Sequence, residues 1–207
     1  MQKLIDELIK DGYLRSPEVI DAFLRIDRAD FVNTHIIDEA YGNYPLHIGF
    51  NQTISQPATV AFMLELLKVQ KGDKVLDVGS GSGWQTALLA TLVGHTGQVF
   101  AVERIDELLT FGRQNCQKFN FDNIEFILGD GSKGLEDIAP FDRIIVAAAA
   151  PEIPPEFKKQ LKVGGRLVIP IGEGTQDIVM VEKQSDKKYY EERRPGFVFV
   201  PLISEQY

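Results

Sequence analysis

Residues 75–83 read VLDVGSGSG and constrain the fold more than any other part of the chain. An apolar run that contains one acid leads into three glycines within five residues, and a helix-like pattern follows directly. Parallel strands end in this way where a tight turn leads into a helix at the carboxyl edge of a sheet. The turn directs backbone N–H groups and the positive end of a helix at one point, so the sequence predicts a ligand site there.

The composition is that of an ordinary globular chain, with 207 residues, 44% of them hydrophobic and 25% charged. A chain of this length forms one domain and buries roughly 70% of its unfolded surface. The net charge of −8 argues against a nucleic-acid-binding face, because such a face is basic. The single cysteine, Cys116, excludes an internal disulfide, and no apolar run approaches the roughly 18 residues of a membrane span. We therefore expect a cytoplasmic protein that binds neither nucleic acid nor membrane.

Strands alternate with helices from residue 74 onward, which is typical of a mainly parallel α/β sheet. Two amphipathic helices and an irregular stretch over residues 31–55 come before this region, followed by a buried helix over 58–69. The predicted fold class is a doubly wound, mainly parallel α/β sheet with an antiparallel late strand pair and N-terminal helices. The expected strands cover residues 74–78, 98–103, 123–128, 141–147, 166–170, 176–182 and 196–202, with helices between the parallel ones over 84–93, 105–119 and 154–161.

The glycine turn differs from two better-known nucleotide-binding turns. A dinucleotide-binding turn has the spacing G-x-G-x-x-G, but here the third glycine, Gly83, comes one position early and Trp84 fills the sixth position. The Lys-Ser/Thr pair of a triphosphate-binding P-loop is also missing from the turn. A purely structural role for the glycines stays open at this point.

Acidic residues accompany three of the expected strands. Asp77 lies inside the first, where a charge is costly without a partner. Glu103 ends the second strand 24 residues after Gly79, where a carboxylate can accept hydrogen bonds from ribose hydroxyls. A surface acid paired with Arg104 is the alternative for Glu103. Asp130 lies between two glycines after the third strand, where it can accept from an adenine amino group or simply form a turn.

These strand ends describe a nucleoside site with little machinery for a pyrophosphate. Such a site fits S-adenosyl-L-methionine better than NAD. The arrangement of glycine turn, ribose acid and adenine-side acid resembles the class I methyltransferases, whose fold is Rossmann-like. The predicted cofactor-binding residues are Asp77, Gly79, Ser80, Gly81, Ser82, Glu103, Arg104, Asp130 and Gly131.

A cluster of polar residues lies upstream of the glycine turn and directly before Pro57. It consists of Gln52, Thr53, Ser55 and Gln56. Helix capping explains a hydroxyl next to Pro57, because Pro is favoured in the first turn of a helix and Ser or Thr before it. Capping does not explain why four polar side chains gather there, so the cluster is a candidate for contacts with a substrate.

The chain is similar to the protein-L-isoaspartate O-methyltransferases in six segments that occur in the same order. The polar cluster, residues 52–57, is the most specific segment, since many methyltransferase families share the glycine turn. The other segments are residues 75–85, 129–131, 148–154, 160–172 and 199–202.

This resemblance implies transfer of a methyl group from S-adenosylmethionine to the α-carboxylate of L-isoaspartyl residues in damaged proteins. The ester then collapses to a succinimide, whose hydrolysis returns part of the damage to normal aspartate. The family's active-site serine is Ser55 here, and Thr53 is the second predicted catalytic residue. We divide the predicted single domain, residues 1–207, into a helical cap with substrate loop (1–57), a cofactor-binding core (58–172) and C-terminal strands (173–207). The predicted substrate-binding residues are Ile54, Gln56, Ala148 and Val200.

Neither a histidine nor a cysteine nor a metal is expected in the chemistry. A carboxylate with a pKa of about 4 is already ionised at neutral pH and needs no general base. Catalysis can therefore depend on holding an oxygen in line with the methyl group, with side chains of Thr53, Ser55 and Gln56 orienting the carboxylate. The three histidines lack the spacing of metal ligands. Cys116 lies on the apolar face of its helix, which predicts a packed thiol.

Some points stay open at the level of sequence. Trp84 stands where the family usually has tyrosine, and Val198 stands where a basic or polar side chain is common. The small residues 147–150 either leave room for a substrate backbone or pack tightly. A methyltransferase with another acceptor, and a non-catalytic relative that binds S-adenosylmethionine, are the alternatives. The expected partners are isoaspartyl-containing proteins and peptides, and the expected state is a monomer.

Overall fold

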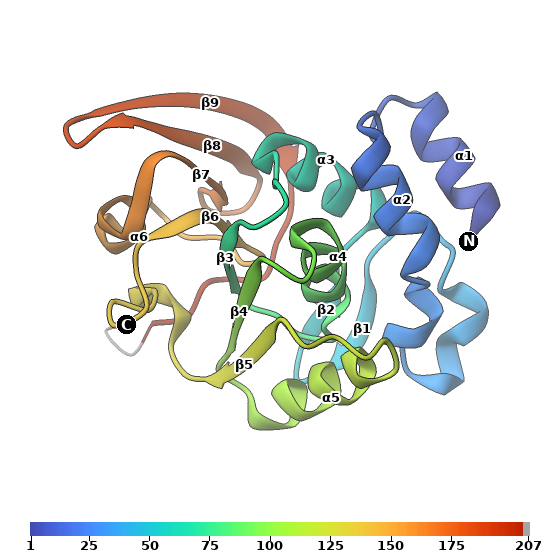
Figure 1. Cartoon of the computed structure of the whole chain (residues 1–207). Helices are drawn as coiled ribbons and strands as arrows, with labels where there is room; N and C mark the ends of the chain where they lie inside the picture. The colour runs from blue at the N-terminus through green and yellow to red at the C-terminus, as the bar shows by residue number, and fades with distance from the viewer. Residues whose placement is uncertain (205–207) are drawn as a thin grey trace.

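The computed structural model describes residues 1–204, and its centre is a seven-stranded sheet with the order β5-β4-β3-β6-β7-β8-β9 (Figure 1). The first five of these strands run parallel, while β8 and β9 pair antiparallel at one edge. This confirms the predicted doubly wound, mainly parallel sheet. The strands are β3 (Lys74–Val78), β4 (Gln98–Glu103), β5 (Ile124–Leu128), β6 (Phe141–Val146), β7 (Leu161–Ile171), β8 (Gln176–Ser185) and β9 (Lys188–Phe197).

The chain builds this sheet outward from β3 in both directions. It first adds β4 and β5 on one side of β3, and then returns to add β6 and β7 on the other side. Sheets of this kind bind ligands outside the carboxyl ends of their strands, at the point where the strand order reverses. The residues that follow β3, β4 and β6 therefore occupy the place where a site is expected.

Helices cover both faces of the sheet. Helices α3 (Pro57–Leu67), α4 (Trp84–Val93) and α5 (Asp106–Gln117) pack on one face, and α6 (Pro155–Gln160) packs on the other. α3 and α4 are buried on nearly all sides, which explains why neither carries a polar face. No helix in the part of the chain that the structure describes is long and apolar enough to cross a membrane.

The N-terminal region ends in a hairpin that the sequence pattern did not predict. Its turn consists of Phe50 and Asn51, with φ angles of 52° and 56°. Asparagine is common in such a turn but phenylalanine is not, so residues 31–55 look irregular in sequence. The elements of this region are α1 (Gln2–Lys10), α2 (Pro17–Arg25), the 3-10 turns η1 (Arg28–Phe31) and η2 (Thr34–Glu39), and the hairpin strands β1 (Leu46–Gly49) and β2 (Gln52–Ile54).

The expected strand over residues 196–202 is wrong. The strand that pairs with β8 is β9, and in Figure 1 the hairpin of the two extends over β7 toward α6, where Lys158 forms an ion pair with Glu191 at 2.9 Å. Half of the β9 side chains are charged and most are exposed, so the strand lacks the apolar alternation that a prediction detects. Residues 198–202 lie instead along Ala149, which donates its N–H to the Val200 carbonyl (2.8 Å) and accepts from the Leu202 N–H (2.7 Å).

Helix packing explains the early third glycine of the turn. Gly83 precedes α4 with a φ of 86°, and a Cβ there would lie 2.8 Å from the Gly112 carbonyl oxygen of α5. Only glycine fits such a contact. Cys116 packs at the same place and donates its thiol to the Gly83 carbonyl at 3.4 Å. Burial raises the pKa of this thiol to about 12, so Cys116 is a packed core group as predicted.

Candidate active site

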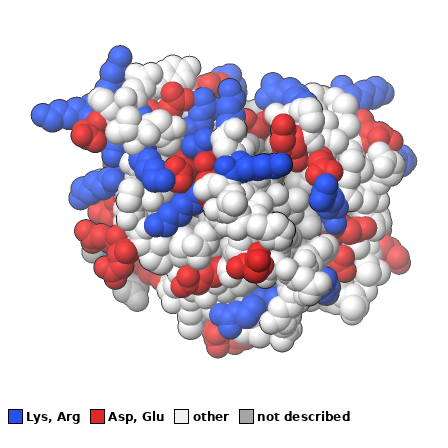
Figure 2. All heavy atoms as spheres, in the orientation of Figure 1, with Lys and Arg blue, Asp and Glu red and all other residues white. Residues whose placement is uncertain are grey.

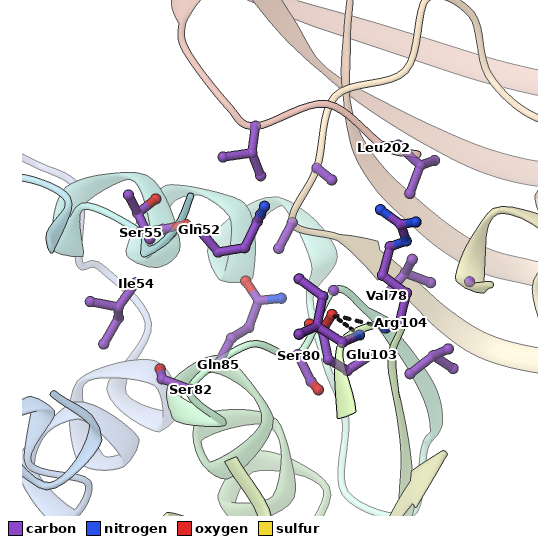
Figure 3. A pocket seen from close by; sticks show the side chains of 18 of the residues that line it. Gln52, Ile54, Ser55, Val78, Ser80, Ser82, Gln85, Glu103, Arg104 and Leu202 are labelled. Atoms are coloured by element: carbon purple, nitrogen blue, oxygen red, sulfur yellow. Dashed lines mark hydrogen bonds between the residues drawn. The ribbon is translucent and has the colours of Figure 1, made fainter. Parts of the chain in front are cut away.

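One pocket at the carboxyl ends of β3, β4 and β6 brings together the glycine turn and the polar cluster (Figure 3). The hairpin strand β2 supplies one wall, and the turns after β3 and β4 supply the opposite one. Among the predicted residues, Gln56, Asp77, Gly81 and Asp130 do not line this pocket. The predicted residues that do line it are Thr53, Ile54, Ser55, Gly79, Ser80, Ser82, Glu103, Arg104, Gly131, Ala148 and Val200.

Glu103, the last residue of β4, is buried in the pocket wall and only 6% exposed. Its carboxylate accepts the backbone N–H groups of Gly81 (3.0 Å), Arg104 (2.8 Å) and Ile105 (3.1 Å). An ionised carboxylate has about four acceptor sites, so capacity remains for a ligand. Within residues 1–204, Glu103 contacts Arg104 through the backbone and not through an ion pair, which contradicts the alternative of a surface acid.

Asp77 lies behind the pocket wall and is completely buried. Its carboxylate accepts from the Gln85 side-chain amide (2.8 Å) and from the Thr86 hydroxyl (2.6 Å). Burial raises the pKa of the Asp77 carboxyl from 3.8 to about 6, and these two hydrogen bonds partly oppose that shift. Gln85 lines the pocket, so Asp77 fixes an amide of the wall instead of forming the wall itself.

Two residues of the wall carry a buried polar atom without a hydrogen-bond partner among residues 1–204. They are the Ser80 hydroxyl and the Trp84 indole N–H. Leaving such a group unpaired is costly, and a bound polar ligand or water removes that cost. Together with the Glu103 acceptor, these groups fit a ligand with hydroxyl, amine and carboxylate groups, as in S-adenosylmethionine.

The side of the pocket opposite the glycine turn comes from β2 and the residue that follows it. Thr53 and Ser55 line the pocket together with Gln52. A neighbouring groove shares Thr53 and Ser55 and extends to Gln56. The Gln56 amide donates to the Asn43 carbonyl at 2.9 Å and so braces the loop. Thr53 and Ser55 therefore lie where the groove meets the pocket.

Asp130 forms a turn in the structure. It accepts the Ser132 backbone N–H at 2.9 Å at the start of the 3-10 turn η3 (Gly131–Lys133). Asp130 does not line the pocket, whereas its neighbour Gly131 does. A Cβ on Gly131 would lie 2.6 Å from the Val78 Cγ1 atom, so glycine keeps this turn close to β3. Contact between Asp130 and an adenine stays a prediction.

The small residues after β6 divide between the pocket wall and backbone packing. Ala147 and Ala148 line the pocket. Ala149 and Ala150 instead form backbone hydrogen bonds with the C-terminal segment and with the end of β7. The strand exit is therefore tightly packed on one side and open to the pocket on the other.

Several pocket residues were not predicted as site residues. Trp84 and Gln85 lie in the first turn of α4, and their position directly after the glycine turn is a usable signal. Gln52 belongs to the polar cluster. Leu202 and Ile203 come from the C-terminal segment; Leu202 belongs to the resembling segment 199–202, whereas no pattern indicated Ile203, because its approach to the sheet depends on long-range pairing.

The fold and this pocket define a class I S-adenosylmethionine-dependent methyltransferase. The model of the family described as Protein-L-isoaspartate(D-aspartate) O-methyltransferase (PCMT) matches residues 1–207. The chain belongs to this family.

Individual relatives agree with the family model. A protein-L-isoaspartate O-methyltransferase of Methanopyrus kandleri is 45% identical over 207 residues, which cover 99% of this chain and 92% of the relative. One of Aeropyrum pernix is 47% identical over 98% of this chain and 79% of the relative. A solved structure of a protein-L-isoaspartate O-methyltransferase from Plasmodium falciparum, in complex with S-adenosyl-L-homocysteine, has a TM-score of 0.87 at 27% identity and is matched over 97% of both chains.

Proposed function

We propose that this chain transfers a methyl group from S-adenosylmethionine to the α-carboxylate of L-isoaspartyl residues in damaged proteins. The observation that carries the proposal is the shared pocket in which the glycine turn faces residues 53–55. Family membership and the names of the relatives support the same reaction. The resulting ester collapses to a succinimide, and hydrolysis of the succinimide returns part of the damage to aspartate.

The half of the site that binds the methyl donor, called the donor half, consists of residues after β3 and β4. Glu103 accepts hydrogen bonds from ribose hydroxyls, and Ser80 and Arg104 lie beside it in the pocket wall. Asp77 holds the amide N–H of Gln85, which leaves the amide oxygen as the acceptor that this side chain offers to a ligand. When bound, S-adenosylmethionine supplies a methyl group on a positively charged sulfur, which is already electrophilic.

The half of the site that binds the methyl acceptor, called the acceptor half, consists of Thr53, Ser55 and the neighbouring groove. An isoaspartyl carboxylate is ionised at neutral pH, so no residue has to remove a proton. The hydroxyls of Thr53 and Ser55 donate to one carboxylate oxygen and orient the other. Neutral donors hold the carboxylate without the tight ion pair that would weaken it as a nucleophile. Rate acceleration then comes mainly from alignment of the two reacting groups.

Replacing Ser55 by alanine is expected to lower kcat about 10- to 100-fold, because a hydrogen bond to a charged group contributes roughly 1.5–3 kcal/mol. Affinity for S-adenosylhomocysteine, measured by calorimetry, is expected to stay close to that of the wild type. Ser185→Ala in the exposed end of β8 is the matched control and should leave both quantities unchanged. A Ser55→Ala protein that loses affinity for S-adenosylhomocysteine would contradict this placement of Ser55.

The reaction itself is tested with two peptides that differ only in one aspartyl linkage. The protein is incubated with radiolabelled S-adenosylmethionine and either the aspartyl or the isoaspartyl peptide. The proposal predicts base-labile radioactive ester on the isoaspartyl peptide alone. Equal labelling of both peptides would favour another acceptor, and cofactor binding without any transfer would favour a non-catalytic relative.

We also propose that the protein is a cytoplasmic monomer that does not bind nucleic acid. On the face shown in Figure 2, basic side chains are mixed with acidic ones instead of forming a continuous stripe. Several basic residues form ion pairs, among them Arg166 with Glu182 at 2.6 Å and Lys162 with Asp142 at 2.8 Å. Light scattering and a nucleic-acid binding assay at low salt test the monomeric state and the lack of nucleic-acid binding.

A further inference from the structure

A buried arginine, Arg28, lies beside the acceptor half of the site. The Arg28 side chain is 0% exposed and belongs to η1, in the N-terminal region. We propose that Arg28 is the positioning residue of the acceptor half, fixing the backbone of Ser55 against the first turn of α4. This inference rests on the proposed role of Ser55.

The guanidinium group of Arg28 donates hydrogen bonds to several backbone carbonyls of the loop that carries Ser55. Its NH1 group donates to the carbonyl oxygens of Ala40 (2.9 Å) and Gly42 (3.1 Å). Its NH2 group donates to the carbonyl oxygens of Tyr44 (3.0 Å) and Ser55 (3.1 Å), with a longer contact of 3.5 Å to the carbonyl of residue 54. One side chain thus joins both ends of the segment 40–55, which contains the β1–β2 hairpin.

The same guanidinium also contacts the donor half. Its central carbon lies 5.4 Å from the centre of the Trp84 ring, in the range of a cation–π interaction. Trp84 begins α4 directly after the glycine turn and lines the pocket. Phe23 of α2 packs edge-on against the Trp84 ring, with ring centres 5.4 Å apart. Arg28 therefore bridges the substrate loop and the helix that follows the glycine turn.

A structural explanation by charge pairing does not apply to Arg28. Within residues 1–204 it forms no ion pair, and its Nε atom lacks a hydrogen-bond partner. Burial lowers its pKa to about 10, which still leaves the group charged at neutral pH. Burying an unpaired charge is expensive, and the carbonyl dipoles and the Trp84 ring offset part of that cost. The planar fork of arginine suits several carbonyls at once, whereas the ammonium group of lysine does not.

The bridge made by Arg28 affects catalysis because the reaction depends on alignment of the carboxylate with the methyl group. A misplacement of reacting groups by about 1 Å can cost roughly 100-fold in rate. If the Ser55 backbone is free to shift, the acceptor carboxylate shifts with it relative to the donor half. A loss of Arg28 therefore acts on turnover more strongly than on cofactor binding.

The test compares Arg28→Lys with Arg25→Lys, the same substitution on an exposed arginine three residues away. Arg28→Lys is expected to lower kcat about 10- to 100-fold, with affinity for S-adenosylhomocysteine within about threefold of wild type. Hydrogen–deuterium exchange of the variant should be faster in residues 40–55 and unchanged in 84–93. Arg25→Lys should match the wild type in all three measurements.

Other results overturn the proposal. Unchanged kcat in a folded Arg28→Lys protein would show that Arg28 does not position Ser55. Parallel losses of kcat, cofactor affinity and protection throughout the chain would show a general role in folding. If the variant does not fold, hydrogen–deuterium exchange of the wild type tests whether Arg28 holds the loop. The bridge predicts that the amides of residues 46–54 open together with those of η1 and the first turn of α4, and much faster exchange in the hairpin would contradict it.

These measurements separate the inference from the function itself. If the wild type does not methylate the isoaspartyl peptide, the proposed function fails. The exchange experiment still reports whether Arg28 holds the loop in that case. If the wild type is active and Arg28→Lys is equally active, only the inference about Arg28 fails.

Discussion

Replacing Glu103 by alanine is expected to raise the dissociation constant of S-adenosylhomocysteine at least about 100-fold. Two hydrogen bonds from ribose hydroxyls to a carboxylate contribute roughly 3–6 kcal/mol together, and a factor of 100 corresponds to about 3 kcal/mol. The variant also releases the N–H groups of Gly81 and Arg104, which Glu103 now holds. The glycine turn thereby loses a contact that fixes its shape. Calorimetric titration of purified variant and wild type measures the change.

Glu107→Ala is the matched control for this experiment. Glu107 lies four residues further on, in the first turn of α5, and is exposed. Its alanine variant should bind S-adenosylhomocysteine as the wild type does. If Glu103→Ala binds within about threefold of the wild type while remaining folded, the donor half has been assigned to the wrong residues.

Replacing Asp77 by asparagine is expected to raise the stability of the variant relative to the wild type as the pH increases from 4 to 7. The folded-state pKa of about 6 lies above the unfolded value of roughly 3.9, so the folded state binds the proton more tightly. The stabilising contribution of protonated Asp77 is complete below about pH 4 and is lost as pH rises through 6. The difference of about two pKa units corresponds to about 3 kcal/mol.

Urea unfolding of both proteins at pH 4, 5, 6 and 7 measures this difference. The free energy of unfolding of Asp77→Asn minus that of the wild type should rise by about 2 kcal/mol between pH 4 and pH 7. Asparagine has nearly the same shape, so packing around Gln85 and Thr86 changes little. A difference that is constant with pH would show that Asp77 titrates normally in the folded protein. A difference that falls with pH would show that its carboxylate is favoured by the fold.

The Asp77→Asn variant should also be a poorer enzyme. The side-chain amide in Asp77→Asn has one acceptor oxygen, whereas the native carboxylate offers separate oxygens to Gln85 and Thr86. The orientation of Gln85 in the pocket wall is then less fixed. Buried charged groups at functional sites commonly lower stability while they support activity.

The sequence predicted the sheet and the strand ends that line the pocket because both have local patterns. Apolar runs between helical repeats identify parallel strands, and acids at strand ends identify the edge where ligands bind. The pattern also gave the early third glycine, but its reason lies in the contact between Gly83 and Gly112 of a later helix. No pattern within one segment reveals a contact between two helices.

Long-range contacts explain what the sequence did not predict. The charged strand β9 has no buried face, and residues 198–202 are fixed by pairing with Ala149. Arg28 looks in sequence like an ordinary surface arginine, although its carbonyl partners lie up to 27 residues away. The sequence predicted that Asp77 needs a partner. It did not predict that Gln85 lies between Asp77 and the pocket.

We have proposed that the glycine turn and residues 53–55 form the two halves of one site. A crystal structure of the protein with S-adenosylhomocysteine and an isoaspartyl peptide is the decisive experiment. We expect the nucleoside against Glu103 and the isoaspartyl carboxylate within hydrogen-bond distance of the Thr53 or Ser55 hydroxyl, facing the sulfur. A carboxylate bound elsewhere, without contact to either hydroxyl, would show that the two segments do not form one site.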